Sequence, residues 1–493
     1  MTTHKFELWA DSFHEGHWAC TQLAKVAAPL GWKHSHKYNQ GFIPVHSYQQ
    51  EKATIEITVY GSYKSWEELP SQIEDLLAWG KPDFVLFDSV TKKIIFAVEE
   101  TAAVPTGNQA LQRCERLYGS ARSKIPFWYL LSEYGVHKDK GIRRDSIWPT
   151  VMALKLTHQH RTPCVVLHYS DLENPESYTS GTGLASLFGI LFQIIANVSS
   201  SKEPFANLED SFQTQYQAML SFVTSQWGNI INFLPGADHL SSKSISKTFA
   251  SMATNPTAYI PWPNNFLIWP KISGLPKEIK EQQHGKSLIK HDPLCEQFEK
   301  ALTDGKAYSL SDNAGSKPQP EKSLLEWITS QSKLFKKAET LSPKAEFTIK
   351  LSDFPTSTGT NRHVTTAKNI VYLYDKWGDV RNSIEKIYPR LRGKLDRTKD
   401  NSPALVYLSN SVKPGRIFGD PFTGQISAYA TAFGKFDSEP RIVLAYFPHQ
   451  VHSQAIVSPG ESKNKGITIM SELTDYLLFS GGVAVQLNTG AVL

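Results

Sequence analysis

The clearest chemical signal in the sequence is a set of acidic residues between positions 81 and 116. Asp83 leads one short apolar segment, and Glu99 stands near the end of the next. A polar turn centred on Val90 and Thr91 separates the two segments, which predicts an antiparallel hairpin. Cross-strand Cβ atoms in such a pair lie roughly 5 Å apart, so the two carboxylates should meet at the open end of the hairpin. They repel each other unless a cation or a proton lies between them.

The end of the second strand leaves two registers open. Because side chains alternate between the two faces of a strand, Glu99 and Thr101 share one face and Glu100 belongs to the other. If the hairpin shifts by one residue, Glu100 replaces Glu99 beside Asp83. Both glutamates therefore stand as candidates.

Paired carboxylates on adjacent strands suit Mg²⁺, because a hard cation prefers oxygen ligands and Mg²⁺ keeps several waters. Such an ion stabilises charge on a phosphate and lowers the pKa of an attacking water. We therefore expect Mg²⁺ to be held by Asp83 and Glu99. The alternative interpretation is that Asp83 lies at a strand entrance and that the two glutamates face solvent. A carboxylate at a buried strand end would be unfavourable without a partner charge. This argument favours the metal site.

The elements around the hairpin predict an α/β domain over residues 1–199, with a mixed sheet flanked by helices. Apolar periodicity alternates between the values typical of helices and of strands. The expected order is helix, strand, helix, strand, strand, helix, strand, helix, strand, over residues 12–28, 54–60, 65–79, 82–87, 93–101, 108 onward, 125–131, 148–156 and 163–169. The apolar run at 184–198 predicts a buried helix and is too short to span a bilayer.

The remainder of the chain predicts two further regions, mostly helical over residues 200–345 and strand-rich, of α+β type, over 346–493. A helix is expected at 324–338. The strand-like segments of the last region are FTIKL, NIVYLYDKW, ALVYLS, ISAYATAF, RIVLAYF and GVAVQL. Residues 304–320 are poor in apolar side chains, which predicts an exposed loop.

Composition narrows the class of protein. The 493 residues carry a formal net charge of +5, which permits a polyanionic partner without requiring one. The four cysteines are scattered, which is typical of reduced thiols in a cytoplasm. The charged N-terminus lacks the apolar stretch of a secretory signal. Neither a GxxxxGK[ST] loop, a GxSxG elbow nor a methyltransferase-like Gly-rich loop is present.

Histidines gather in the N-terminal fifth of the chain. His14 and His17 have HxxH spacing, but no third metal ligand follows nearby, so we interpret them as surface residues. His34, His36 and His46 fall in a polar segment punctuated by Gly and Pro, which predicts a loop. No function is assigned to them.

The densest basic stretch of the sequence runs from residue 381 to residue 399. Its candidates for DNA contact are Arg390, Arg392, Lys394 and Arg397. A solvated helix face would look similar, so both interpretations stay open. Neighbouring turns at 410–416 and 419–421 could enter a groove.

The hairpin resembles the core of the PD-(D/E)XK nuclease superfamily, which includes many restriction endonucleases. Pro82-Asp83 matches the PD element, and Glu99-Glu100-Thr101 stands where the (D/E)XK element belongs. The resemblance covers residues 50–170, about a quarter of the chain. It implies a restriction-endonuclease-like fold and a Mg²⁺-dependent nuclease.

The helix after the hairpin matches the one that follows in those enzymes, where Gln112 would support catalysis and Arg113 would contact DNA. The chain departs from the family at one position. Thr101 stands where family members carry the Lys that orients or activates the attacking water. The resemblance therefore leaves open which group handles the water, with Gln112 and Arg113 as candidates.

The resemblance implies an endonuclease of double-stranded DNA, most like a prokaryotic, cytoplasmic type II restriction enzyme, with no membrane partner. One active site cuts one strand, so we expect a homodimer, and a separate methyltransferase would carry out any modification. Specific recognition needs about 1,000–2,500 Å² of protein surface, which the C-terminal residues would supply. Two alternatives remain: an anti-phage nuclease effector with a C-terminal sensor, and a non-catalytic DNA-binding or scaffold protein.

Overall fold

The structure is a computed structural model of the 493-residue chain. It describes residues 2–39, 42–63, 68–101, 111–132, 134–136, 142–144, 146–169, 183–227, 231, 237–254, 258–261, 269–273, 292–304, 306–309, 369–409, 422–433, 441–457 and 465–493. The predicted loop at 304–320 lies largely outside these ranges. So do the predicted helix at 324–338, the FTIKL segment and the two basic turns after residue 409.

The chain forms two compact units. The first comprises residues 1–105, 116–225 and 238–262, and the second comprises 106–115, 226–237 and 263–493. This division differs from the predicted one, because helices expected in a separate middle region belong to the first unit. Gln215, for example, accepts a hydrogen bond from the Trp128 indole at 3.0 Å, which ties its helix to a strand of the first unit.

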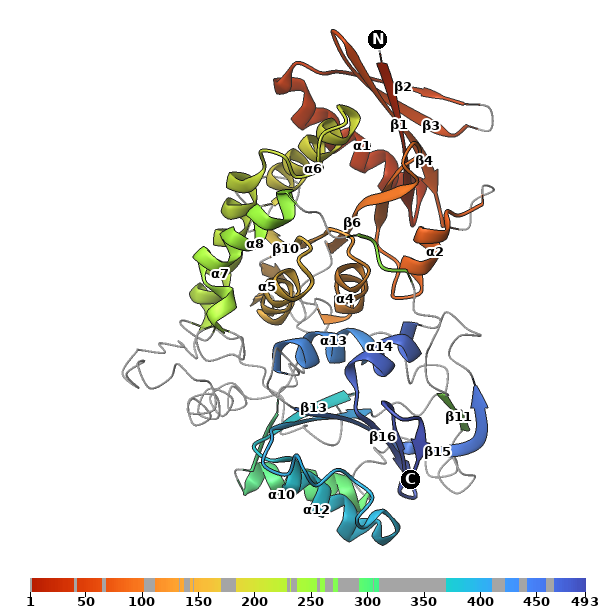
Figure 1. The fold of residues 1–493 in the computed structure, drawn as a ribbon, viewed down its shortest axis with the longest axis vertical. Helices are drawn as coiled ribbons and strands as arrows, with labels where there is room; N and C mark the ends of the chain where they lie inside the picture. Colours follow the sequence, from red (N-terminus) through yellow and green to blue (C-terminus); the bar gives the residue numbers. More distant parts are fainter. Residues whose placement is uncertain are drawn as a thin grey trace. The chain divides into compact units, whose positions relative to one another are not determined.

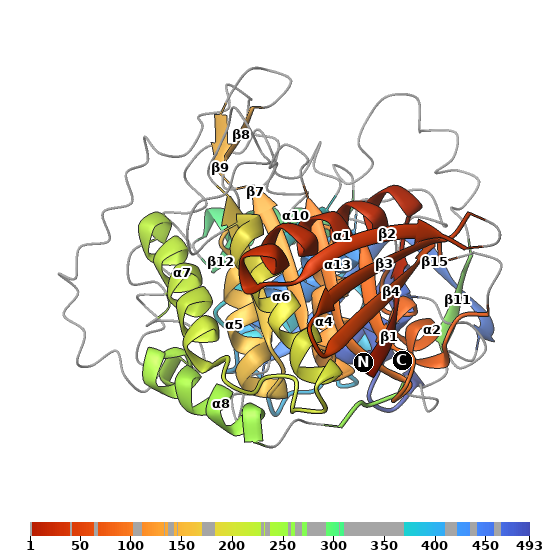
Figure 2. The same cartoon turned by 90° about the horizontal axis from the view of Figure 1, so that it is seen from above.

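The first unit is built on a mixed eight-stranded sheet in the order β10-β7-β6-β5-β1-β4-β3-β2 (Figures 1 and 2). The pairs β10–β7, β7–β6 and β1–β4 are parallel, and the other neighbours are antiparallel. The strands are β1 (Thr2–Ala10), β2 (Lys33–Tyr38), β3 (Pro44–Gln50), β4 (Ala53–Gly61), β5 (Phe84–Asp88), β6 (Lys93–Thr101), β7 (Phe127–Ser132) and β10 (Cys164–Tyr169). The predicted α/β class and mixed sheet are confirmed.

Helices flank this sheet, as the sequence predicted. They are α1 (Phe13–Ala27), η1 (Ala28–Leu30), α2 (Ser71–Leu77), α4 (Cys114–Arg122), α5 (Trp148–His160), α6 (Gly183–Ser199), α7 (Glu209–Trp227), η3 (Ala237–Leu240) and α8 (Ser242–Thr254). A small separate ribbon pairs β8 (Tyr134–Val136) with β9 (Ile142–Arg144). Helix α1 begins where the Ser12 side chain accepts a hydrogen bond from the Glu15 amide. It packs beside α6 (Figure 1).

Two predictions for this unit were wrong in detail. Helix α2 begins at Ser71, directly after Pro70, rather than at the capping box expected from Ser65, which lies outside the described residues. Proline is tolerated at the start of a helix but not inside it, so the helix cannot run through Pro70. The three histidines expected in a loop lie in strands instead, His34 and His36 in β2 and His46 in β3.

Close packing of α4 gives a stability prediction. A Cβ atom at Gly119 would lie 2.1 Å from the Cβ atom of Trp79, so Gly119→Ala should lower the free energy of unfolding by about 1–3 kcal/mol. The matched control is Gly189→Ala in α6, where a Cβ atom meets nothing within 4 Å. That change should raise stability by about 0.5–1 kcal/mol, because Gly is the weaker helix former. Denaturant melts of the two variants check this; equal effects would contradict the described packing.

The second unit has its own eight-stranded sheet, ordered β12-β13-β14-β15-β16-β17-β18, with β11 added along β15. The strands are β11 (Trp269–Ser273), β12 (Ala307–Ser309), β13 (Asn369–Tyr374), β14 (Ala404–Ser409), β15 (Ile442–Val457), β16 (Tyr476–Ser480), β17 (Val483–Gln486) and β18 (Ala491–Val492). The helices are α10 (Pro293–Thr303), α12 (Trp377–Ile387), η8 (Pro389–Leu391), α13 (Phe422–Phe433) and α14 (Lys465–Leu473).

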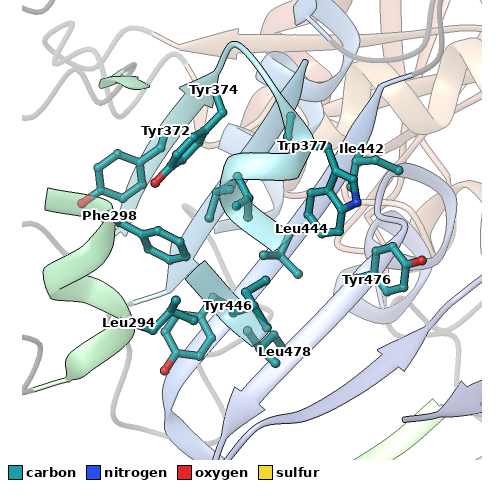
Figure 3. Close-up of a cluster of buried hydrophobic side chains, with 14 of the residues drawn as sticks. Leu294, Phe298, Tyr372, Tyr374, Trp377, Ile442, Leu444, Tyr446, Tyr476 and Leu478 are labelled. Atoms are coloured by element: carbon teal, nitrogen blue, oxygen red, sulfur yellow. The ribbon is translucent and has the colours of Figure 1, made fainter. Parts of the chain in front are cut away.

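One face of this sheet is closed by α10 and α12. Phe298 of α10 lies against Tyr372 and Tyr374 of β13, and Trp377 of α12 stacks on Tyr476 of β16 (Figure 3). On the other side of β14, the Tyr407 hydroxyl donates to Gln425 of α13 at 2.7 Å. The unit thus has a helical layer on each face of its sheet.

The α+β label for this region was wrong in its finer detail. Strands β14, β15 and β16 are parallel and are connected through α13 and α14, which is the α/β arrangement. The error came from the segment Ile426–Phe433, which was read as a strand and is part of α13. Its described residues are buried on every side, so no polar face reveals the helical period.

Candidate active site

The acidic hairpin forms as predicted, and its register is set by a bulge. Near the turn, Phe87 pairs with Ile94, whereas further along Leu86 pairs with Phe96, so one extra residue lies in β6. Phe84 then pairs with Val98, and the same register continued by one residue places Asp83 opposite Glu99. Without the bulge, Asp83 would share its face with Glu100 instead.

Burial supports the same assignment. Glu99 is fully buried and Thr101 is 5% exposed, whereas Glu100 between them is partly exposed. The Glu100 backbone N–H donates to Asp83 Oδ2 at 2.6 Å. Glu100 therefore contacts Asp83 through its main chain. Glu99 is therefore the glutamate that shares a site with Asp83.

A cation lies at both carboxylates, and it is Arg116 of α4. Its Nη1 atom donates to Glu99 Oε2 in a short hydrogen bond and lies 3.9 Å from Asp83 Oδ1. All three side chains are largely buried, with Arg116 14% and Asp83 16% exposed. The guanidinium group thus relieves the repulsion that two neighbouring carboxylates would otherwise suffer.

Tyr63 completes the surroundings of the acid pair. Its hydroxyl donates to the Pro82 carbonyl at 2.8 Å, and the Asp11 amide donates to the Asp83 carbonyl at 2.9 Å. These two hydrogen bonds fix the backbone that carries Asp83. Burial raises the pKa of Tyr63 well above its ordinary value, and the negative charges of Asp83 and Glu99 raise it further. Tyr63 therefore stays protonated and acts as a hydrogen-bond donor.

The other predicted site residues lie outside this constellation. Gln112 and Arg113 precede α4, which begins at Cys114, and both are partly exposed. They belong to the part of the chain assigned to the second unit. A Cβ atom on Gly424 would lie 2.0 Å from the Leu111 carbonyl oxygen, so α13 packs directly against this segment. Their predicted catalytic and DNA-contacting functions remain predictions.

Some basic side chains of the stretch at 381–399 bind oxygen atoms of the protein, and others are exposed on a turn. Arg390 donates to the Gly482 and Leu493 carbonyls at 2.8 and 3.1 Å, and Arg397 donates to Glu385 at 3.2 Å. Arg392 and Lys394 are exposed on the turn that follows η8. Within this stretch, Arg392 and Lys394 are the two candidates best placed to meet phosphate.

Buried Arg381 belongs to an ion network next to this turn, and Glu385 of that network accepts a hydrogen bond from the Gly393 amide at 3.1 Å. Its Nε and Nη2 atoms donate to both oxygens of Asp400 at 2.8 and 2.7 Å, and its Nη1 donates to Glu385 at 2.9 Å. These carboxylates hold the pKa of Arg381 above its usual value, with Asp400 the largest cause. The sequence patch is thus partly an internal ion network.

The carboxylates of Asp83 and Glu99 can be compared with the ligands that a divalent cation prefers. Asp83 Oδ1 and Glu99 Oε2 both lie within 4 Å of Arg116 Nη1, so the two carboxylates border one position. Mg²⁺ is usually held by one or two carboxylates, with waters and substrate phosphates as its other ligands. Across the described residues, no group of three or more His, Cys, Asp or Glu side chains is arranged around a metal position. The pair therefore offers two oxygen ligands of the kind that Mg²⁺ prefers, beside the position that Arg116 occupies.

Comparisons of the chain with family models, with curated proteins and with solved structures return no match. Of the helices in the described ranges, none is long and apolar enough to cross a membrane. The four cysteines are all buried and free.

Sequence reasoning missed the importance of Arg116, to which it assigned no function. A signal was present, because two facing carboxylates require a neighbouring cation. Arg116 is the first basic residue within α4, and Cys114 and Leu117 on either side of it are fully buried. An arginine so close to buried neighbours is typical of a paired cation.

Proposed function

We propose that the first unit is a Mg²⁺-dependent endonuclease that hydrolyses phosphodiester bonds of double-stranded DNA, of the restriction-endonuclease kind. The observation that carries this proposal is the convergence of Asp83 and Glu99 on one cation position at the end of the β5–β6 hairpin. The order of elements supports it as well: β5 and β6 are antiparallel, α4 follows, and β7 returns parallel to β6.

Asp83 and Glu99 would hold the metal ion, which when bound supplies charge stabilisation at the scissile phosphate and an acidified water. The chain itself supplies the positioning. The Glu100 amide orients the Asp83 carboxylate, and Tyr63 and Asp11 fix its backbone. Burial of Glu99 strengthens its attraction for any cation, because the local dielectric is low.

Arg116 has two tasks in this proposal. In the absence of metal it balances one of the two negative charges of the acid pair, and it would bind the phosphate of the substrate when a metal ion takes its place. A guanidinium group suits both partners, since it forms hydrogen bonds with carboxylates and phosphates alike. Thr101, on the same face as Glu99, offers a hydroxyl where the related nucleases carry Lys.

Cleavage of DNA tests the proposal. Purified protein is incubated with unmodified phage DNA and Mg²⁺, with a parallel sample in EDTA. We expect discrete fragments that require Mg²⁺ and that disappear in EDTA, as a sequence-specific enzyme would give. Binding without any cleavage, across several DNA sources, would overturn the nuclease proposal.

A second candidate function is a non-catalytic DNA-binding or scaffold protein. The observation that favours it is the ion pair of Arg116 with Glu99, which stabilises the hairpin without any metal ion. Under this alternative Mg²⁺ changes neither stability nor DNA binding. An anti-phage effector with a sensing second unit differs from restriction in its cleavage pattern, which would be unspecific and would depend on an added signal.

DNA affinity should depend on the exposed half of the basic stretch. Arg392→Ala combined with Lys394→Ala should weaken binding, and the slope of log affinity against log salt should fall by about 2, since each phosphate contact contributes about 0.9. Fluorescence anisotropy over a salt series measures both quantities. The matched control is Lys300→Ala with Lys306→Ala, two exposed lysines of the same unit outside the stretch. Equal effects of the two double variants would show that the basic stretch does not contact DNA.

A further inference from the structure

The outermost strands of the first unit form a ribbon that the proposed active site does not use. This β2–β3 ribbon spans residues 33–50, and β2 is the edge of the sheet, paired among the described strands with β3 alone (Figure 2). Every residue of β2 is exposed except His34, which is partly exposed. An exposed sheet edge requires either protection or a partner.

The ribbon has a one-sided charge. No Asp or Glu occurs between residues 33 and 50, whereas Lys33 and Lys37 are both exposed on β2. Cross-strand neighbours place these two lysines beside Gln49 and Val45. The first carboxylate beyond the ribbon is that of the exposed Glu51, directly after β3, and Glu56 on β4 pairs with Ser47 of β3. A cationic strip without interspersed acids is complementary to a polyanion.

Aromatic side chains stand at the far end of the same ribbon. Tyr38 is 58% exposed and Phe42 is 85% exposed, the largest exposure among the large hydrophobic side chains of the described residues. The Phe42 backbone has φ +64°, a strained conformation for a bulky residue. Its amide donates to the Asn39 carbonyl at 3.0 Å, which helps to fix the turn. The turn holds a phenyl ring in solvent, where it gains nothing from the protein core.

The histidines of the ribbon anchor it. His46 is fully buried; its Nε2 lies 3.1 Å from His17 Nδ1 of α1, and its Nδ1 lies 2.9 Å from His34 Nε2 of β2. Burial, together with the positive charges of the neighbouring histidines, lowers the pKa of His46 to about 3 and lowers that of His34. Both rings are therefore neutral at neutral pH, so the two lysines supply the charge of β2.

Pairing with a second copy of the chain would suit this edge poorly. An antiparallel pair of β2 strands centred on Ser35 would place Lys33 of one copy opposite Lys37 of the other, and directly opposed like charges are destabilising. Exposed lysines are a common means of preventing edge pairing. They do not account for the exposed Tyr38 and Phe42, which an anti-aggregation role would avoid.

We propose, on the basis of the function proposed above, that the β2–β3 ribbon is a contact surface for the duplex DNA substrate. Lys33 and Lys37 meet backbone phosphates, and Phe42 packs at the tip against the edge of a groove. The major groove admits a two-stranded ribbon, and apolar side chains at such tips can pack against base edges or wedge between base steps.

Charge reversal tests the lysines. Binding of a labelled duplex is measured in EDTA, so that cleavage cannot interfere, for the double variant Lys33→Glu and Lys37→Glu. We expect affinity to fall by roughly tenfold or more and the salt slope to fall by about 2. The control is Lys25→Glu on the exposed side of α1, which should change affinity much less. Equal affinity losses in both proteins, or none in either, would overturn the inference.

Phe42→Ser tests the tip separately. It should weaken binding while leaving the salt slope unchanged, because no charge is lost. Thermal melting should be unaffected, since the ring is exposed. An unchanged affinity, or a change in oligomeric state in place of DNA binding, would contradict the assignment of this surface to DNA.

The binding assay separates this inference from the nuclease proposal. If the protein binds duplex DNA through the ribbon but never cleaves it, the nuclease proposal fails and the ribbon assignment stands. If it cleaves DNA and the ribbon variants bind and cleave normally, the ribbon assignment fails alone. Failure of the unaltered protein to bind any duplex would overturn both.

Discussion

Asp83→Ala should abolish Mg²⁺-dependent DNA cleavage while DNA binding persists. Asp83 supplies one of the two carboxylates that converge on a single cation position, and the remaining Glu99 would hold a metal ion poorly. We expect the cleavage rate to fall by more than about 100-fold, because even the outer-shell partners of metal ligands typically account for 10–100-fold. Cleavage of labelled duplex with excess protein measures this, and anisotropy in EDTA measures binding.

The two neighbouring glutamates provide the matched pair for that experiment. Glu99→Gln should reduce cleavage as Asp83→Ala does, whereas Glu100→Gln should leave most activity, since the bulge in β6 gives Asp83 and Glu99 a common face. Both substitutions keep side-chain size and remove one charge. Loss of activity in Glu100→Gln with normal activity in Glu99→Gln would contradict the register of the site.

Arg116→Ala should have the second large effect, on stability. Removing the guanidinium leaves Glu99 buried without its cation and Asp83 beside it, and breaking a buried ion pair typically costs about 3–5 kcal/mol. Added Mg²⁺ should restore part of this loss, about 2.7 kcal/mol when its concentration is 100 times the dissociation constant. Thermal melts with a Mg²⁺ series measure both the loss and the recovery.

Two further variants separate this effect from simple loss of a helix residue. Arg116→Lys keeps the charge with a different shape and should lose less stability, although Lys lacks the planar fork of Arg. Arg122→Ala lies in the last turn of the same helix and should respond to Mg²⁺ no more than the unaltered protein. Melting temperatures of Arg116→Ala that do not depend on Mg²⁺ would show that the acid pair is not a metal site.

The hairpin was predictable because its determinants are local. Two apolar segments and a polar turn define β5 and β6, and strand alternation places Asp83 near Glu99. The bulge was not predictable, since no residue type in β6 marks the extra residue that lies between Ile94 and Phe96. A single extra residue reverses the face of each following side chain. The choice between Glu99 and Glu100 therefore required the structure.

The sequence also indicated the layered fold of the first unit, but not its limits. The apolar run at 184–198, for example, predicted the buried helix that is α6. The attachment of α7 depends on long-range contacts, for example between Tyr216 and Thr157, and on the hydrogen bond from Trp128 to Gln215. Such contacts have no signature along the chain, so the helices after residue 200 were placed in a separate region.

In the basic stretch, composition alone does not separate cations that are bound within the protein from cations that are exposed. Its charge density left DNA contact and a solvated helix face open as interpretations. In the structure, Arg381 is buried between Asp400 and Glu385, and Arg390 is bound to main-chain carbonyls. Arginines that pair with distant carboxylates cannot be recognised from local spacing. Arg390 and Arg397 are exposed as well, so it is their hydrogen bonds to protein oxygens that distinguish them from Arg392 and Lys394.

The most direct test of the account is a calorimetric titration of Mg²⁺ into the unaltered protein and into the Asp83→Ala and Glu100→Gln variants. We predict that the unaltered protein and Glu100→Gln bind Mg²⁺ at the acid pair, and that Asp83→Ala loses this binding. Identical heats in all three proteins would contradict the claim that Asp83 and Glu99 form a metal site. The claim would also be contradicted if the unaltered protein binds no Mg²⁺ either in the presence or in the absence of duplex DNA.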